Sequence, residues 1–352
     1  MNAEFWRDRR VLVTGHTGFK GAWLSLWLRS LGAEVSGFAL PPATSPNLCA
    51  LLGADVRSIL GDLRDERQVG DALERCRPQI VLHLAAQALV RESYADPLGT
   101  YRTNVIGTAN LLDACRRQSG LQGVVVVTSD KVYENDGAER AFEEGDRLGG
   151  SDPYSNSKAC AELVTACFRD SFFRGGPPLA TVRAGNVIGG GDWSADRLIP
   201  DCLRALDGGA PVRLRYPQAV RPWQHVLDPL AGYLSLAAAL AIAPQGAPRA
   251  VNFGPNPASF CTVSDVVEAF SARFGGKPGW ARDAGDHPPE AQTLRLSSAL
   301  AERALGWRAR LDIAAALKWT ADWHLAQRAG DDMLRFTLEQ IRRYQQAGPV
   351  QP

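Results

Sequence analysis

RVLVTGHTGFKG, residues 10–21, joins a short apolar run to glycines spaced as GxxGxxG. Apolar side chains at helical spacing follow over residues 20–31, so this stretch predicts a strand, a tight turn and a helix. In such a turn the backbone can approach a pyrophosphate, whose charge is favoured by the free N–H groups and dipole of the helix N-terminus. The stretch therefore predicts a dinucleotide site. The alternative is a tight turn without a ligand.

Strands and helices continue to alternate along the chain. Strands are predicted at residues 34–40, 56–60, 79–85, 123–128, 180–183 and 250–253, and helices at 66–76, 101–118 and 227–241. This alternation requires crossover connections and a parallel sheet with both faces covered. The predicted fold class is α/β: a Rossmann-type doubly wound parallel sheet with a smaller, discontinuous α/β cap that binds the substrate.

The composition of the loops suggests where the cap begins. From residue 189 the chain is rich in Gly, Pro, Trp and Arg, which suits irregular loops over a sheet. We predict an NAD-binding Rossmann domain over residues 1–185, which the chain rejoins near residues 226–255. The predicted cap consists of residues 186–225 and 256–330, and residues 331–352 form a tail without recognised chemistry.

Charge and cysteine usage exclude several classes of protein. Lys+Arg 39 against Asp+Glu 38 gives a formal net charge of +1, which argues against binding nucleic acid or a membrane by bulk electrostatics. The longest apolar stretch, 231–243, is shorter than the roughly 18 residues of a spanning helix, and no signal peptide is visible. Seven scattered cysteines without a CxxC pair indicate a reducing cytoplasm, buried thiols and no metal site. His83 and His324 are also predicted to be core residues.

The cofactor is predicted to be NAD. Asp62, after the third strand, is suited to hydrogen-bond an adenine edge, and the small residues after the fourth strand admit a cofactor. The second strand ends in Phe-Ala-Leu-Pro at 38–41, with neither an acidic residue for the ribose nor an arginine for a 2′-phosphate, so NAD is favoured over NADP. The predicted cofactor-binding residues are Gly15, Thr17, Gly18, Phe19, Lys20, Gly21, Asp62, Leu63, Leu84, Ala85, Ala86, Thr128, Tyr154 and Lys158.

The catalytic groups follow the strand at 123–128. Tyr154 and Lys158 lie one helical turn apart on one face, and the ammonium is expected to lower the pKa of the phenol. Tyr154 could then deprotonate a sugar hydroxyl, whose oxygen the Ser129 hydroxyl would hold. Asp130 and Lys131 add acid and base groups that a simple dehydrogenase does not need.

These residues resemble the extended short-chain dehydrogenase/reductases, and within them the nucleotide-sugar 4,6-dehydratases. In the members acting on dTDP-glucose a glutamate follows the Ser-Asp pair, whereas the lysine of TSDK at 128–131 is similar to the members acting on CDP-glucose. The resemblance covers about residues 8 to 330. Its motifs are TGHTGFKG, LAAQALVR, TSDK, YSNSK, RAGNVIGGGDW, DRLIPD and RPWQHVLDP.

The resemblance implies a complete reaction, from CDP-D-glucose to CDP-4-keto-6-deoxy-D-glucose, for deoxysugar biosynthesis. Tyr154 takes the C4 hydroxyl proton while NAD accepts the C4 hydride, water is lost across C5 and C6, and the hydride returns to C6. Asp130 protonates the departing C6 hydroxyl. Lys131 either removes the C5 proton or, as a cation, stabilises the enolate or orients Asp130. The base role needs surroundings that destabilise its charge, because lysine is ordinarily protonated at neutral pH.

The expected partners are a nucleotide sugar and further copies of the chain. The family pairs subunits through helices that correspond here to 101–118 and 151–173, so a homodimer or homotetramer is expected. Predicted substrate-binding residues are Gln87, Asn186, Trp193, Arg197, Arg221, Gln224, His225 and Glu290; each could instead anchor a loop. The alternatives are a dehydratase of dTDP-glucose or GDP-mannose, an epimerase or reductase of the same family, and a non-catalytic dinucleotide sensor.

Overall fold

One parallel sheet organises the chain. The computed structural model describes residues 3–135, 137, 140–276, 279–285 and 293–348. Seven strands pair in the order β11-β6-β5-β4-β1-β2-β3, every neighbour parallel. They are β1 (Arg10–Thr14), β2 (Glu34–Ala39), β3 (Arg57–Leu60), β4 (Ile80–His83), β5 (Gly123–Val127), β6 (Leu179–Ala184) and β11 (Ala250–Phe253). The order reverses between β1 and β4, so a ligand crevice is expected at the carboxyl ends of these two strands.

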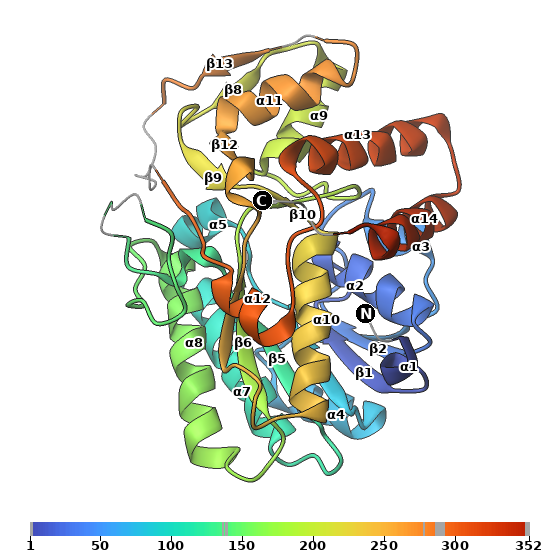
Figure 1. Ribbon diagram of the computed structural model, residues 1–352, viewed down its shortest axis with the longest axis vertical. Helices are drawn as coiled ribbons and strands as arrows, with labels where there is room; N and C mark the ends of the chain where they lie inside the picture. The colour runs from blue at the N-terminus through green and yellow to red at the C-terminus, as the bar shows by residue number, and fades with distance from the viewer. Residues whose placement is uncertain (1–2, 136, 138–139, 277–278, 286–292, 349–352) are drawn as a thin grey trace.

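Helices cover both faces of the sheet (Figure 1). Alternate strand residues point to opposite faces: Val11 and Val13 join one apolar cluster, and Leu12 joins the other. The first cluster includes side chains of α2 (Phe19–Ser30) and α10 (Leu227–Ile242), and the second those of α4 (Glu66–Cys76) and α7 (Gly107–Cys115). α8 (Pro153–Phe172) packs beside α7. The predicted doubly wound α/β fold is confirmed.

The predicted elements agree with the structure to within a few residues. α4 and β11 have the predicted bounds, whereas β4 ends at His83 rather than at residue 85. The helix predicted at 101–118 is a longer helical run: α6 (Pro97–Tyr101), a π-helical turn at Arg102–Ile106, and α7. His83 and His324 lie in the core as predicted. All seven cysteines are free and three are buried, but Cys167 is exposed on α8.

The glycine turn between β1 and α2 leaves no room for side chains. Gly15 has φ +76, and a Cβ there would lie 2.7 Å from the Ala85 nitrogen. A Cβ on Gly21 would lie 2.0 Å from the Gly15 carbonyl oxygen. Only glycine fits at both positions, and as a result the N-terminus of α2 faces the carboxyl ends of β1 and β4.

A smaller group of elements covers the carboxyl ends of the strands, at the top of Figure 1. Its strands form two-stranded pairs, β8 with β13, β9 with β12 and β7 with β10. An apolar cluster within it includes Phe270, Ile199 and Trp223. Its elements are β7 (Val187–Ile188), α9 (Leu198–Gly208), β8 (Val212–Leu214), β9 (Val220–Pro222), β10 (Gln224–His225), β12 (Phe260–Thr262), α11 (Val263–Ala272), β13 (Trp280–Arg282) and α13 (Ile313–Ala329).

Short elements complete the described chain. They are α1 (Ala3–Trp6), α3 (Leu48–Leu52), α5 (Val90–Ala95), α12 (Ala299–Leu305) and α14 (Met333–Gln346), with 3-10 turns at Asp130–Val132 and Pro257–Ser259. Within the described residues, no helix has the length and apolar character needed to cross a membrane.

The C-terminal helix α14 is anchored to the main domain through a buried carboxyl group. Asp228 Oδ1, in the first turn of α10, accepts hydrogen bonds from the Tyr344 hydroxyl at 2.8 Å and from the Arg310 backbone N–H at 2.7 Å. Asp228 is fully buried, and burial raises its pKa to about 7. The tail predicted for residues 331–352 therefore contains a helix that packs on the core, while the domain bounds stay a prediction.

We expect this carboxyl group to make stability depend on pH. The folded protein binds the Asp228 proton more tightly than the unfolded chain, so this stabilisation is present below about pH 4 and is lost as pH rises toward 7. Asp228→Asn keeps an acceptor for both donors and removes the titration. Between pH 5 and pH 8 the free energy of unfolding, measured with urea, should fall by about 2 kcal/mol less in the variant than in the parent. Parallel pH curves for variant and parent would contradict this assignment.

Candidate active site

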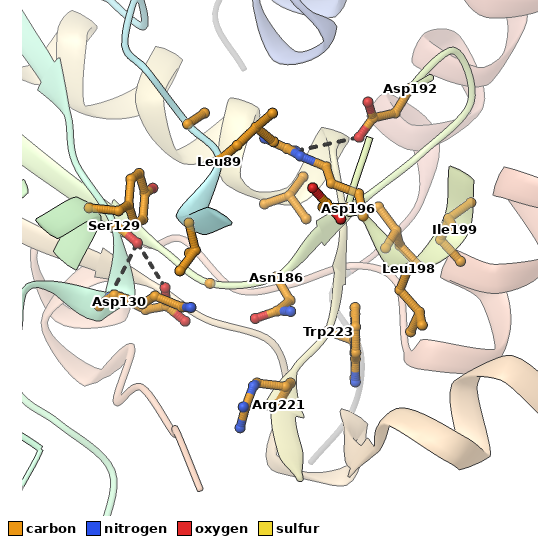
Figure 2. A pocket seen from close by; sticks show the side chains of 18 of the residues that line it. Leu89, Ser129, Asp130, Asn186, Asp192, Asp196, Leu198, Ile199, Arg221 and Trp223 are labelled. Atoms are coloured by element: carbon orange, nitrogen blue, oxygen red, sulfur yellow. Dashed lines mark hydrogen bonds and ion pairs between the residues drawn. The ribbon is translucent and has the colours of Figure 1, made fainter. Parts of the chain in front are cut away.

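A cavity of about 330 Å³ lies between the carboxyl ends of the strands and the cap. Figure 2 shows Ser129 and Asp130 on one side of it, Asp192, Leu198 and Ile199 on the other, and Asn186 between them. The predicted site residues that line it are Lys20, Leu84, Ala86, Thr128, Ser129, Asp130, Lys131, Tyr154, Lys158, Asn186, Arg197 and Arg221. The fold thus brings all five predicted catalytic residues to one cavity.

A 3-10 turn after β5 positions the acid and hydroxyl groups. Ser129 caps this turn: its Oγ accepts from the Lys131 backbone N–H at 3.2 Å and donates to Asp130 Oδ1 at 3.0 Å. Asp130 is buried, and its Oδ2 has no hydrogen-bond partner among the described residues. Burial raises the pKa of Asp130, although Lys131, Ser129 and Arg221 oppose this shift. A carboxyl group in these surroundings retains its proton more readily and is suited to act as a general acid.

The first turns of α8 carry the Tyr/Lys pair. Lys158 Nζ donates to the Val127 carbonyl at 3.1 Å, and burial lowers its pKa to about 8. Burial raises the pKa of Tyr154, and the hydrogen bond with Ser129 only partly offsets this. The expectation of a lowered Tyr154 pKa is therefore wrong, because loss of solvent around the phenolate outweighs the effects of Ser129 and of the Arg197 charge.

The residues present fit a dinucleotide. A Cβ at Gly15 or Gly21 would collide with protein backbone, so glycine at both positions permits the tight turn that brings backbone N–H groups to the N-terminus of α2, where a pyrophosphate could bind. Lys20 lies where the turn meets the catalytic residues; burial, Arg197 and Lys158 lower its pKa to about 7. Together with α2 and the small residues Ala85 and Ala86, this turn could hold the cofactor.

Other predicted cofactor residues have structural contacts of their own. Thr17 Oγ1 donates to the Leu40 carbonyl at 2.9 Å, which joins the glycine turn to the end of β2. Asp62 pairs with Arg64, and hydrogen bonding to that guanidinium holds the pKa of Asp62 low. Leu63 belongs to the apolar core. Phe19 packs at the edge of the first core cluster. Their contacts with a cofactor stay predictions.

Four predicted substrate residues do not line the cavity. Gln224 and His225 are fully buried: Gln224 Nε2 donates to the Phe253 carbonyl at 2.8 Å, and the His225 ring packs edge-on against Trp23 and Trp319. The Trp193 ring packs against Trp323 and His324.

Gln87 is the fourth of these residues. Its amide donates to the Leu89 carbonyl and to Thr100 Oγ1, both at 3.0 Å, so it shapes the loop that lines the cavity rather than the cavity wall itself. Glu290 lies outside the described residues.

The cavity also has polar residues that the sequence did not single out. Arg91 of α5 pairs with Asp196 of the cap at 2.7 Å, and Asp192 pairs with the predicted Arg197 at 3.4 Å. The others are Asp201, Arg213, Arg215, Tyr216 and Trp223. Most stand within or beside the motifs LAAQALVR, DRLIPD and RPWQHV. The motifs could have located them, but only the structure shows which side chains face inward.

This arrangement supports an oxidation coupled to acid and base steps. Tyr154 hydrogen-bonds Ser129, so the two hydroxyl groups converge on one position in the cavity. The neighbouring Asp130 can supply a proton, and Lys131 lines the same wall. Arg197 and Arg221 lie toward the cap, where their positive charges could bind a diphosphate.

Known proteins resemble this chain in sequence and in fold. Residues 11–254 match the model of the NAD dependent epimerase/dehydratase family. A CDP-glucose 4,6-dehydratase of Salmonella typhimurium is 43% identical over 355 residues, which covers 99% of each chain. A double mutant of DesIV, a dTDP-glucose 4,6-dehydratase of Streptomyces venezuelae solved with NAD bound, has a TM-score of 0.79 at 25% identity, covering 92% of this chain and 99% of that one. The epimerase Mth375 of Methanothermobacter thermautotrophicus, with a TM-score of 0.80 at 22% identity over 97% of both chains, is similar in fold alone.

Proposed function

The chain belongs to the NAD dependent epimerase/dehydratase family, and on that premise we propose that it converts CDP-D-glucose to CDP-4-keto-6-deoxy-D-glucose. The enzyme is a nucleotide-sugar 4,6-dehydratase with NAD as its cofactor. One observation carries the dehydration: a buried acid, Asp130, and an amine, Lys131, directly follow the Ser129 that hydrogen-bonds Tyr154. A family member that only oxidises, reduces or epimerises at C4 has no use for this acid and amine.

The first part of the reaction is an oxidation at C4. The glycine turn would hold NAD, which would supply the hydride acceptor for C4 and the hydride donor for C6. Tyr154 removes the proton of the C4 hydroxyl while Ser129 holds the same oxygen. Lys158 is needed as a cation, because its charge favours the phenolate of Tyr154. Its Nζ is held by the Val127 carbonyl, and Lys158 lines the same cavity as Tyr154.

The second part is the loss of water. A ketone at C4 makes the C5 proton acidic, and we propose that Lys131 removes it. Asp130 protonates the C6 hydroxyl as it leaves, and the raised pKa of Asp130 keeps the required proton available. Lys131 then returns a proton to C5 after C6 has been reduced. Oxidation and reduction cancel. The proton that Tyr154 has gained equals the one that Asp130 has given up, so exchange with solvent restores both groups and the net change is loss of one water molecule.

The cytidine nucleotide is supported by the Salmonella relative and by Lys131, which stands where members acting on dTDP-glucose have glutamate. We expect purified protein with NAD to convert CDP-glucose at least tenfold faster than dTDP-glucose, UDP-glucose or GDP-mannose. The 4-keto-6-deoxy product is detected by its absorbance in alkali. Turnover of another nucleotide sugar alone would replace the proposed substrate, and turnover of none would refute the dehydratase function.

The cellular setting is also part of the proposal. We propose that the enzyme works in the cytoplasm as a homodimer or homotetramer, and that its product supplies deoxysugars for a lipopolysaccharide O-antigen. Exposed apolar side chains support self-association: Leu98 of α6, Ile106 of the π-helical turn, and Leu163 and Phe172 of α8. Light scattering that gives a monomer at micromolar concentration would contradict the assembly.

A further inference from the structure

A buried ion pair lies behind the catalytic residues. Glu162 of α8 and Arg183 of β6 each have a side chain that is 4% exposed. The guanidinium of Arg183 donates two hydrogen bonds to the carboxylate of Glu162, from Nε to Oε1 at 3.0 Å and from Nη2 to Oε2 at 2.8 Å. Bidentate pairs of this kind are strong and directional. Neither residue lines the cavity, so the pair can act on the reaction only through other residues.

The carboxylate of Glu162 also fixes the strands that carry the site. Its Oε1 accepts a hydrogen bond from the Thr128 hydroxyl, next to the catalytic Ser129, and its Oε2 accepts one from Thr181 Oγ1 at 2.7 Å. Four donors therefore converge on one carboxylate. They join the end of β5 to α8 and β6, the three elements that meet at the catalytic residues.

Glu162 also continues the catalytic face of α8. Tyr154, Lys158 and Glu162 stand at i, i+4 and i+8, so they lie one above another on the same side of the helix. Burial lowers the pKa of Lys158, and the negative charge of Glu162 opposes this shift.

Besides the Tyr154 phenol one turn away, two titratable groups on other elements interact with Lys158, and neither helps to keep it charged. They are Lys20 of α2, which repels it, and His83 of β4, whose pKa burial lowers to about 3 so that it is neutral. In the part of the chain that the structure describes, Glu162 is the counter-charge of Lys158.

We propose that Glu162 is a positioning residue of the active site: its carboxylate, held by Arg183, keeps Lys158 charged and Thr128 in place without touching the substrate. A purely structural pair could be replaced by apolar side chains of similar size at little cost. The electrostatic role cannot be replaced in this way, and this difference makes the proposal testable. The significance for catalysis rests on the proposed function, whereas the effect on Lys158 does not.

The decisive variant is Glu162→Met/Arg183→Met, which removes both charges and leaves no unpaired buried arginine. The chain has five lysines, so the titration of Lys158 can be followed by NMR of 15Nζ-labelled lysine without substrate, with Lys158→Met to identify the signal. We expect Lys158 in the double variant to lose its proton at least about one pH unit lower than in the parent. The alkaline limb of kcat should move in the same direction while KM stays within about threefold. An unchanged titration would overturn the proposal.

A matched control and a second variant complete the test. Thr181→Val removes one hydrogen bond to the same carboxylate but keeps both charges, so the Lys158 titration should match that of the parent. Glu162→Asp keeps the charge but withdraws the carboxylate by one methylene; it should lower kcat about tenfold with little change in the titration. If the double variant does not fold, the Glu162→Asp variant is the test of the proposal. A kcat of that variant equal to the parent's would then overturn the proposal.

The two proposals fail in different ways. A parent protein that turns over none of the nucleotide sugars refutes the dehydratase function, yet the NMR titration still tests the effect of Glu162 on Lys158. An active parent whose double variant keeps the titration of Lys158 overturns only the role of Glu162.

Discussion

Tyr154→Phe should lower kcat with CDP-glucose by about 10³-fold or more, because phenylalanine cannot take the proton of the C4 hydroxyl. The ring remains, so the packing around it should persist, and the hydrogen bond with Ser129 is lost. Reduced nicotinamide should fail to form in a single turnover, followed by its absorbance. Calorimetric titration should show binding of the nucleotide sugar within a few fold of the parent, because the charged residues toward the cap are unchanged.

A second tyrosine provides the control. Tyr101→Phe makes the same chemical change outside the cavity, where the hydroxyl donates to Asn156 Oδ1 at 2.8 Å, and it should retain turnover within a few fold. Rapid formation of reduced nicotinamide by Tyr154→Phe would mean that another group, with Ser129 as the nearest candidate, removes the C4 proton.

Lys131→Met should separate the two halves of the reaction. The change removes the amine and leaves Ser129, Tyr154 and Lys158 in place, so C4 oxidation should continue within a few fold. Product formation should fall by about 10²–10⁴-fold, because the C5 proton has lost its base. In deuterated water the parent should exchange the C5 proton and the variant should not, as mass spectrometry of the nucleotide sugar would show.

The outcome also decides between the two roles of Lys131. Normal exchange at C5 in the variant would exclude the base role and favour electrostatic stabilisation of the enolate. Lys318→Met is the matched control, since Lys318 pairs with Asp322 on α13, away from the cavity, at 2.6 Å. That variant should behave as the parent in both halves of the reaction.

Local patterns predicted the fold and the candidate catalytic residues that the structure brings to one cavity. The spacing of the glycines is visible in the sequence, and the structure shows why Gly15 and Gly21 are needed: a Cβ at either would collide with backbone. Ser129, Asp130 and Lys131 directly follow a buried strand, and parallel strands present their carboxyl ends at one edge of the sheet. Spacing along one helix places Tyr154 and Lys158 together.

Substrate residues were harder to predict because their orientation depends on packing. Arg221 and Trp223 line the cavity, whereas Gln224 and His225, directly after them in the same motif, are fully buried away from it. This segment passes from β9, paired with β12, to β10, paired with β7. Where a strand changes partners within a few residues, its alternation does not reveal which side chains face a ligand.

The sequence by itself determined the parallel sheet, the glycine turn after its first strand, and the candidate catalytic residues that meet at one cavity, because each depends on spacing within one element or on the end of a strand. Only the tertiary structure decided how those residues ionise. Burial raises the pKa of Tyr154, where the sequence had predicted a fall, and it raises that of Asp130 as well. The structure also joined Glu162 to Arg183, across two elements, behind Lys158. Solvent exclusion and contacts between distant segments have no local signature, because they exist only once the chain has folded.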